Sequence, residues 1–326
     1  MRTALLKLAL GLWLGLQACH SALAQPLKLT LGHGAAPSNP RHEAAVKFAE
    51  AVKVKTQGRI EVQVAHSAQL GDDVAMLAAL RAGTLDMSVN SQGPIAALVP
   101  EYAAYGLPFL FSSSARAFKL LDGPLGKELA EKSAAQGFVV LGYWDNGIRH
   151  MTNNKHPIIK PSDLGDLRMR VPPDGVLTDV MQALGAEPRQ MRFADLYAAL
   201  KQGKVDGQEN PIANIHASKF YEVQKYLSLT GHQFQMSPLI IRRTAWERLP
   251  EADRRAVQEA ATEATAFQRR RFQETEAQHL QDLKARGMQV STVDKTLFQK
   301  ATVGVAGKWM FGPINAYAIR VVGAAR

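Results

Sequence analysis

The sequence predicts an α/β fold of two lobes, each a mainly parallel sheet flanked by helices, and three observations support this prediction. A nine-residue pattern occurs twice, at 78–86 and at 198–206. Strand and helix patterns alternate along the first part of the chain, which is typical of doubly wound parallel sheets. A helical pattern continues from Leu249 to Arg286 and, at about 1.5 Å per residue, reaches roughly 54 Å. A helix of that length can lie across both lobes.

The repeated pattern is interpreted as a helix end, a glycine, a short strand and a polar residue. Gly83 and Gly203 follow the helix in the two copies, and glycine adopts the left-handed conformation needed there without steric cost. Ligands bind outside the carboxyl ends of the strands in open α/β sheets, so we expect Asn90 and Asn210 on opposite walls of one cleft. The alternative is that helix–glycine–strand units recur in any α/β protein.

The first lobe begins with a strand at 27–32 and a helix at 40–58, in which Ala44, Phe48 and Val52 share one face. Strict alternation of apolar and polar residues predicts a second strand at 59–65. The patterns that follow are a helix at 72–82 and strands at 85–89 and 138–144, after which we expect the chain to change lobe.

The second lobe shows the same alternation of strands and helices, with a strand at 166–171, helices at 175–184 and 193–202, and a strand at 205. The long helix begins at 249–251, because proline suits a first helical turn and acidic residues suit the positive end of the helix dipole. We expect its buried stripe to contain Val257, Ala261, Ala264, Phe272, Leu280 and Leu283. The predicted first lobe is therefore 25–146 plus about 236–275, and the second is 147–235 plus about 276–326.

The N-terminus has the features of a secretory signal peptide. Arg2 and Lys7 provide positive charge, residues 8–16 are apolar, and Ala22-Leu23-Ala24 is a cleavage site, so residues 1–24 are the predicted signal. We expect an exported, periplasmic protein. Cys19 is the only cysteine, and the alternative that it is lipidated and anchors the chain stays open. Cleavage after Ala24 leaves no thiol for catalysis or metal binding.

The charge pattern argues against nucleic acid as a partner. The chain carries 39 basic and 29 acidic residues, but the basic residues are scattered and form no stripe with aromatic residues. A positive balance favours the capture of small anions. Catalytic and phosphate-binding motifs are absent from the sequence, as is any metal-spaced histidine cluster, so we expect neither an enzyme nor a bound cofactor.

The strand at 166–171 carries the sharpest local signal for a ligand. Arg168 and Arg170 face one side of it, and Arg170 lies at the carboxyl end, where ligands bind. A guanidinium can hold a carboxylate through two parallel hydrogen bonds. The alternative is a surface arginine paired with a neighbouring acid.

Several stretches together resemble the periplasmic solute-binding subunit of TRAP (tripartite ATP-independent periplasmic) transporters. The resemblance extends from about 27 to 287, and the matching stretches are 69–73, 107–111, 146–149, 163–172, 205–211 and 219–227. It implies two α/β lobes hinged around a cleft and braced by the long helix.

The resemblance also implies roles for four residues. Arg170 corresponds to the arginine that clamps the ligand carboxylate, and Arg149 would contact the same carboxylate or an adjacent hydroxyl. Asn210 would form a hydrogen bond in the carboxylate region. Phe193 aligns with an aromatic residue that packs on the ligand, although without the family it would be interpreted as helix core.

The family varies in the first lobe, where the sequence suggests further candidates. These are Asn90 and Gln92 after a strand, His33 at the end of the first strand, and Asp73 at a helix start. Asp73 falls opposite Phe193 in the repeat, although capping its own helix is the alternative. Additional wall candidates are Asn146, Asn214 and His232, of which His232 could equally be a structural histidine.

These candidates suggest neutral hydrogen-bonding groups around a single arginine pair. They favour a ligand with one carboxylate and several hydroxyls, such as a hexuronate or related sugar acid, because buried polar groups require partners. The runner-up is a C4-dicarboxylate, for which only His33 is an obvious second cation. Delivery to a membrane permease is the expected role. Alternatives are a ligand sensor for a membrane receptor and an enzyme acting on an anion.

Overall fold

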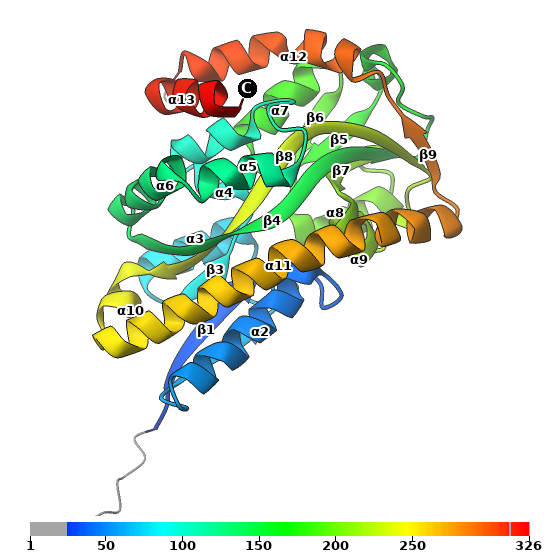
Figure 1. Ribbon diagram of the computed structural model, residues 1–326. Helices are drawn as coiled ribbons and strands as arrows, with labels where there is room; N and C mark the ends of the chain where they lie inside the picture. Colours follow the sequence, from blue (N-terminus) through cyan, green and yellow to red (C-terminus); the bar gives the residue numbers. More distant parts are fainter. Residues whose placement is uncertain (1–24, 313, 326) are drawn as a thin grey trace, which may run out of the picture.

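The computed structural model describes residues 25–312 and 314–325 (Figure 1). The predicted signal peptide and Cys19 lie outside the described residues. Within these residues one nine-stranded sheet has the order β2-β1-β3-β8-β4-β7-β5-β6, with β9 paired to β8. Its strands are β1 (Leu27–His33), β2 (Ile60–Ala65), β3 (Met87–Val89), β4 (Phe138–Asn153), β5 (Arg168–Val171), β6 (Glu187–Gln190), β7 (Gly207–Pro211), β8 (Tyr226–Arg242) and β9 (Gln289–Thr292).

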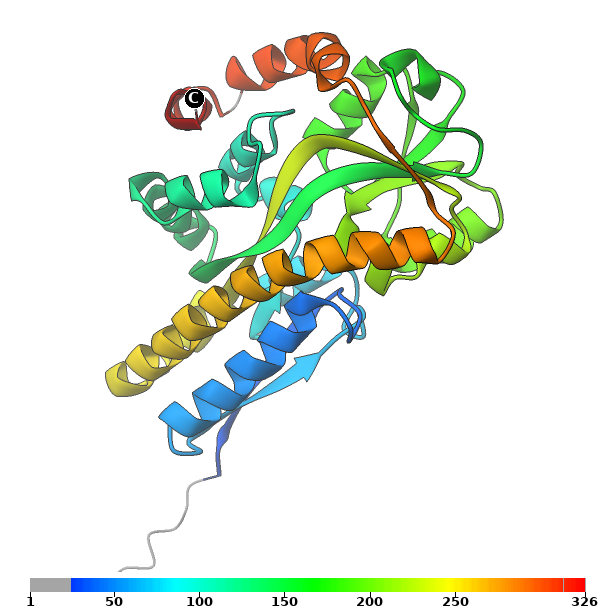
Figure 2. The ribbon, with the colours of Figure 1, turned by 45° about the vertical axis from the view of Figure 1, so that its right-hand side comes forward.

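Helices cover both faces of this sheet (Figures 1 and 2). The α-helices are α2 (Pro40–Lys55), α3 (Asp73–Ala82), α4 (Gln92–Ala96), α5 (Ser114–Leu121), α6 (Pro124–Ala135), α7 (Gly175–Ala183), α8 (Phe193–Lys201), α9 (Ile212–Ala217), α10 (Arg243–Glu247), α11 (Glu251–Ala285), α12 (Lys295–Met310) and α13 (Asn315–Ala325). Short 3₁₀ helices are η1 (Pro100–Gly106), η2 (Pro161–Leu164) and η3 (Phe220–Glu222). No helix of the described residues is long and apolar enough to cross a membrane.

The two lobes are joined by the long antiparallel strands β4 and β8. In the first lobe β1, β2 and β3 run parallel, and in the second lobe β5, β6 and β7 run parallel. The prediction of a mainly parallel sheet in each lobe is therefore confirmed for these strands, whereas β4 and β8 pair antiparallel along both lobes. The sequence did not predict that one strand pair would belong to both.

The expected strand at 138–144 was too short. β4 continues to Asn153, so the chain changes lobe inside a strand and not after it. The polar run Asp145-Asn146-Gly147 interrupts the apolar alternation, but the structure accommodates it as a register shift against β8. Gly147 has φ +103°, and a Cβ there would lie 2.7 Å from Phe272 Cζ, so the crossing requires glycine.

The predicted long helix is confirmed as α11, which lies beside α2 and along β4 (Figures 1 and 2). At the lobe crossing, the Gln268 side chain replaces strand pairing, because its Oε1 accepts from Asp145 N at 2.7 Å and its Nε2 donates to Asp145 O at 2.8 Å. Five of the six expected stripe residues are buried, and Leu280 is half-buried. The helix thus braces the point where the lobes meet.

The shared aspartate of the repeated pattern has the same structural role in both lobes. Asp86 accepts from Thr30 N at 3.0 Å and pairs with Arg242, whereas Asp206 accepts from Arg168 N at 2.9 Å and pairs with the side chain of Arg168. Each aspartate therefore ties its strand to a neighbour. The strand expected at 205 begins two positions later, at Gly207.

The C-terminal helices divide between the lobes. α12 contacts α7 of the second lobe, whereas α13 contacts η1 and α5 of the first lobe. Tyr317 of α13 donates to Leu125 O at 2.8 Å and lies 3.2 Å from the hydroxyl of Tyr105. α13 thus packs against elements of the predicted first lobe, a contact that leaves no periodic signal because its partners are distant in sequence.

Candidate ligand-binding cleft

A cavity of about 250 Å³ lies between the lobes, and residues of both lobes line it. Its polar lining includes Arg41, Asp72, Asp73, Asn146, Arg149, Arg170, Arg192, Asn210, Asn214 and Gln235. Its apolar lining includes Val74, Pro94, Pro172, Pro173, Phe193, Tyr197 and Phe220. Seven of the eleven candidates predicted from the sequence therefore face one cavity. Asp73 and Phe193, which correspond to each other in the register of the repeat, both line this cavity.

Arg149 is held in a buried ion pair. Its Nη2 donates to Glu209 Oε1 at 2.7 Å and to Glu209 O at 2.6 Å, its Nε contacts Glu209 Oε2, and its Nη1 donates to Gln235 Oε1 at 2.7 Å. β4 and β7 are neighbouring antiparallel strands, which explains how residues 60 positions apart meet. Most of the hydrogen-bonding capacity of Arg149 is therefore already used by the protein.

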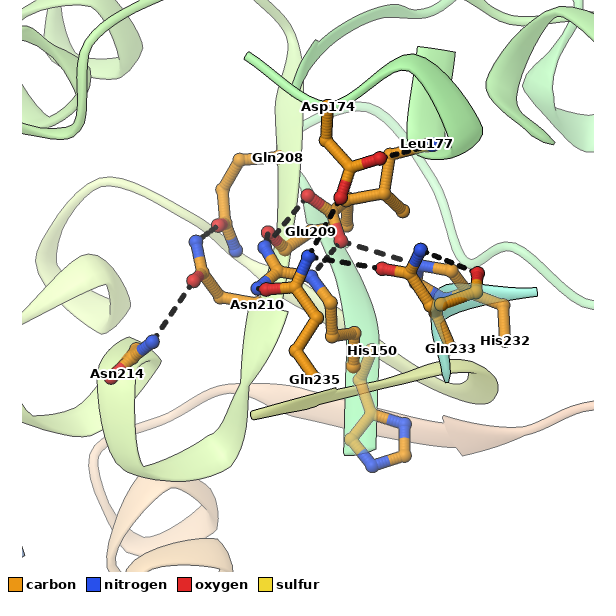
Figure 3. A network of polar contacts seen from close by, with 12 residues as sticks. His150, Asp174, Leu177, Gln208, Glu209, Asn210, Asn214, His232, Gln233 and Gln235 are labelled. Carbon is orange, nitrogen blue, oxygen red and sulfur yellow. Dashed lines mark hydrogen bonds and ion pairs between the residues drawn. The ribbon is translucent and has the colours of Figure 1, made fainter. Parts of the chain in front are cut away.

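Glu209 is the centre of a larger buried network (Figure 3). His232 Nε2 lies 3.3 Å from Glu209 Oε2, and Thr230 Oγ1 lies 2.8 Å from His232 Nδ1. Burial alone would raise the pKa of Glu209, but the guanidinium of Arg149 and the imidazole of His232 hold that pKa below its usual value. Burial lowers the pKa of His232, against the effect of Glu209. His232 therefore supports the network, which agrees with its alternative interpretation as a structural histidine.

Gln235 links this network to the second-lobe helix α7 (Figure 3). Its Nε2 donates to Asp174 Oδ2 at 3.0 Å, while its Oε1 accepts from Asn146 Nδ2 at 3.2 Å. Asp174 also caps α7 by accepting from Leu177 N. Burial raises the pKa of Asp174 to about 6. The floor of the cavity is thus a fixed polar layer.

Arg170 retains hydrogen-bonding capacity for a ligand. It is 2% exposed, and its Nε and Nη2 donate to Met191 O at 3.0 and 2.7 Å. Its Nη1 has no partner among the described residues, and its guanidinium carbon lies 5.7 Å from the ring centroid of Phe193. Burial lowers the pKa of Arg170 to about 9. A buried cation of this kind gains from an anion in the cavity.

Arg41 is a functional candidate that the sequence analysis missed. It lies in the first turn of α2, is 6% exposed, and donates from Nη2 to Asn146 Oδ1 at 2.6 Å and to Ser237 Oγ at 2.7 Å. No carboxylate of a described residue pairs with it, and burial lowers its pKa. The sequence did contain a sign of this: Arg41 lies three positions before Ala44 and therefore on the buried face of the helix. The expectation of a single arginine pair was therefore wrong.

Asp73 lines the cleft, and one of its two carboxylate oxygens is buried without a partner in the described part of the chain. The cap of α3 is Asp72, whose side chain accepts from Ala75 N, so the alternative that Asp73 caps its own helix is wrong. Asp73 Oδ2 accepts from Ser91 N at 3.1 Å, whereas the buried Oδ1 has no partner among the described residues. A carboxylate in the lining of the cleft can accept from a hydroxyl of a ligand.

The amides of the second-lobe wall are joined to one another. Asn214 Nδ2 donates to Asn146 Oδ1 at 3.3 Å and to Asn210 Oδ1 at 3.2 Å, while Asn210 Nδ2 donates to Gln208 Oε1 at 2.5 Å (Figure 3). Phe193 packs edge-on against Phe220 and leaves the rest of its ring for the cavity. Asn146, Asn210, Asn214 and Phe193 therefore all belong to the lining of one cavity.

Four candidates do not line the cavity. His33 is buried against Ala35 N and the ring of His42, and burial, followed by the charge of Arg41, lowers its pKa to about 3. Gln92 Oε1 accepts from Met236 N at 3.2 Å. Asn90 Nδ2 donates to Asp73 O at 2.8 Å and thereby positions Asp73. The fourth candidate is His232, and the side chains of all four are used inside the protein.

The arrangement is suited to holding an anion. Arg41, Arg149 and Arg170 bring three buried guanidiniums from both lobes to the cavity, and of these only Arg149 is paired with a buried glutamate of the described residues. The described residues contain no cluster of three or more potential metal ligands.

Comparisons with known proteins show the family of this chain. The family model described as "Bacterial extracellular solute-binding protein, family 7" matches residues 31–309. An uncharacterised protein of Sinorhizobium fredii is 50% identical over 85% of this chain, but the chain spans only 51% of that relative.

Two solved structures of TRAP periplasmic solute-binding proteins share the fold and differ in their ligands. One, from Polaromonas and bound to D-erythronate, is 37% identical with a TM-score of 0.88, covering 91% of this chain and 98% of that one. The other, from Sulfurospirillum deleyianum and bound to succinate, is 31% identical with a TM-score of 0.86, covering 90% and 98%. The chain therefore belongs to family 7 of the bacterial extracellular solute-binding proteins, the binding subunits of TRAP transporters.

Proposed function

We propose that this protein captures a polyhydroxy monocarboxylate, a sugar acid, in the periplasm and delivers it to a TRAP membrane permease. The observation that carries the choice of ligand is that a guanidinium with free hydrogen-bonding capacity and a carboxylate line the same cavity. Arg170 can donate to the carboxylate of a ligand, and the carboxylate of Asp73 can accept from a hydroxyl. A single small molecule with both groups satisfies both residues.

Closure is the proposed mechanism of capture. The carboxylate binds Arg170 of the second lobe, and the hydroxyls bind Asp73 of the first, so the ligand bridges the lobes and favours the form in which they are together. Arg41 reaches the same cavity from the first lobe and adds a second positive charge. Phe193 covers the apolar face of the carbon chain.

The size of the cavity supports a small acid. Its volume of about 250 Å³ lies below the range of roughly 300–1,000 Å³ that is usual for pockets of drug-sized ligands. A chain of four to six carbons suits this space, which includes the erythronate bound by the Polaromonas relative and the hexuronates expected from the sequence.

A C4-dicarboxylate is the second candidate, and Arg41 favours it. The sequence offered only His33 as a second cation in the first lobe, but Arg41 supplies a buried guanidinium there. Asp73 opposes this candidate, because its carboxylate would repel a second carboxylate in the same small cavity. The succinate-bound relative is a reason to test both classes.

A thermal-shift and calorimetric screen of the mature protein tests the proposal. The panel contains erythronate, galactonate, glucuronate, galacturonate, succinate and malate. A ligand at a hundred times its dissociation constant adds about 2.7 kcal/mol to the free energy of unfolding. Stabilisation by hydroxy monocarboxylates above succinate is expected. Preference for succinate would contradict the sugar-acid assignment, and a lack of binding by every acid would contradict the proposed function.

Delivery and location need separate tests. Membrane vesicles that contain the cognate permease should take up the labelled acid only when this protein is added. If the acid binds tightly but uptake is independent of the protein, the sensor alternative would replace transport. Mass spectrometry of the exported protein should give a chain that begins at Gln25; a lipidated Cys19 would instead show an anchored form.

A further inference from the structure

Two helix caps of the first lobe contact the second lobe across the cleft. Asn39 caps α2 by accepting from Arg41 N, and Asp72 caps α3 by accepting from Ala75 N. In both residues one side-chain atom serves the helix, and the other atom faces the opposite lobe.

The Asn39 contact is the stronger of the two. Its Oδ1 accepts from Arg41 N at 2.9 Å, and its Nδ2 donates to Asn214 Oδ1 of α9 at 2.9 Å. Asn39 is only 3% exposed, so water competes little for this interaction. Asn214 uses its amide nitrogen for Asn146 and Asn210, and its oxygen is therefore engaged by the opposite lobe.

The Asp72 contact lies nearer to solvent. Its Oδ1 accepts from Ala75 N at 2.8 Å, and its Oδ2 lies 4.0 Å from Arg192 Nε of the second lobe. Arg192 also pairs with Asp195, at 2.7 Å. An exposed ion pair of this length contributes less than a buried hydrogen bond.

We propose that Asn39 and Asp72 form a two-point latch, which holds the lobes together over the ligand and sets the rate of its release. Both contacts join different lobes, so both must break when the cleft opens. The contact to Asn214 continues through Asn210 and Asn146, which line the ligand cavity, so the latch is connected to the wall that touches the ligand. This inference rests on the proposed binding function and adds a control of its kinetics.

The residue types allow the latch to be removed without removing the caps. Serine is as good an N-cap as asparagine but lacks the amide donor, so Asn39→Ser keeps the start of α2 and loses the contact with Asn214. Asp72→Asn keeps an oxygen for the cap of α3 and loses the charge that faces Arg192. Asp294→Ser is the matched control, because Asp294 caps α12 by accepting from Thr296 N, and among the described residues its side chain forms no hydrogen bond or ion pair with the opposite lobe.

The first test is the dissociation rate of galactonate, or of whichever acid of the screen binds best, by stopped-flow tryptophan fluorescence. The loss of one hydrogen bond predicts a rate about five-fold faster for Asn39→Ser. Asp72→Asn should give an increase of up to about two-fold. The dissociation rate of Asp294→Ser should stay at its wild-type value. An unchanged dissociation rate in Asn39→Ser would overturn the latch.

The second test needs no ligand and so separates the latch from the proposed function. The single cysteine of the sequence is Cys19, so the mature chain can be spin-labelled after Arg81→Cys in the first lobe and Lys201→Cys in the second. Asn39→Ser should increase the population with a long interlobe distance even if no acid in the screen binds. An unchanged distance distribution in the ligand-free protein would also refute the latch.

Discussion

Arg149 of β4 and Glu209 of β7 form a buried ion pair at the floor of the cleft, with side chains 3% and 0% exposed. Breaking such a pair by removing one partner is costly, because it leaves an uncompensated buried charge. Arg149 therefore orders the floor, and the free hydrogen-bonding capacity for a ligand anion lies mainly on Arg170 and Arg41.

Arg170→Ala should abolish tight binding without unfolding the protein. Loss of one partner of a buried ion pair costs roughly 3–5 kcal/mol, so we expect the affinity for the best acid to fall at least about a hundred-fold. Calorimetric titration measures this, and circular dichroism checks the fold. Arg170→Lys keeps the charge but not the planar fork, and should give an intermediate affinity. Wild-type affinity in Arg170→Ala would remove Arg170 from the site.

Asp73→Asn should change selectivity between ligand classes. The substitution weakens the acceptor that faces a ligand hydroxyl and removes the charge that repels a second carboxylate. We expect galactonate affinity to fall about ten-fold, as for a lost hydrogen bond to a charged group, while succinate affinity stays or rises. The ratio of the two dissociation constants is the measured quantity. An equal loss for both acids would mean that Asp73 only supports the fold.

Arg41→Met should separate ligand affinity from stability. The variant loses charge-assisted hydrogen bonds worth about 1.5–3 kcal/mol, so the affinity should fall at least about ten-fold. The ligand-free protein should be as stable as wild type or more stable, because a buried cation without an acidic partner is replaced by an apolar side chain. Titration and urea unfolding measure the two effects. A stability loss with unchanged affinity would show that Arg41 is only structural.

Gly147→Ala should destabilise the lobe crossing. Gly147 has φ +103°, and the added Cβ would lie 2.7 Å from Phe272 Cζ and 2.9 Å from Pro211 Cβ. Overpacking of this kind costs about 1–3 kcal/mol, and the backbone conformation adds to that cost. Urea unfolding gives the change in the free energy of unfolding. Gly304→Ala in α12 is the control, since a Cβ there has open space, and it should not lose stability.

Asp206 should make part of the stability depend on acid pH. The Arg168 side chain, through its hydrogen bonds, lowers the pKa of Asp206 to about 2. A carboxyl whose folded pKa is depressed contributes stability above its unfolded pKa of about 3.9, and this contribution is lost as the pH falls through about 2. Asp206→Asn should therefore be less stable than wild type at pH 7, and the difference should shrink between about pH 4 and 2. A pH-independent difference would argue against ionic pairing.

The sequence by itself determined the elements whose signals are local. Repetition at 78–86 and 198–206 predicted equivalent units, and helical periodicity predicted α11 almost to its ends. The strand that ends near Arg170 predicted a cation at the carboxyl edge of a sheet, where the structure places it. These signals are readable because burial of a helix or strand face imposes a period on neighbouring residues.

The tertiary structure alone decided which distant side chains meet. Arg41 reaches Asn146, 105 positions away, and Asn39 meets Asn214, 175 positions away. β4 carries the chain between lobes inside a strand, and α13 returns to the first lobe. Such contacts follow from the packing of whole elements and leave no period in the sequence. The sequence therefore predicted the family and the position of Arg170, whereas packing decided the burial of Arg41, the surroundings of Asp73 and the contacts between the lobes.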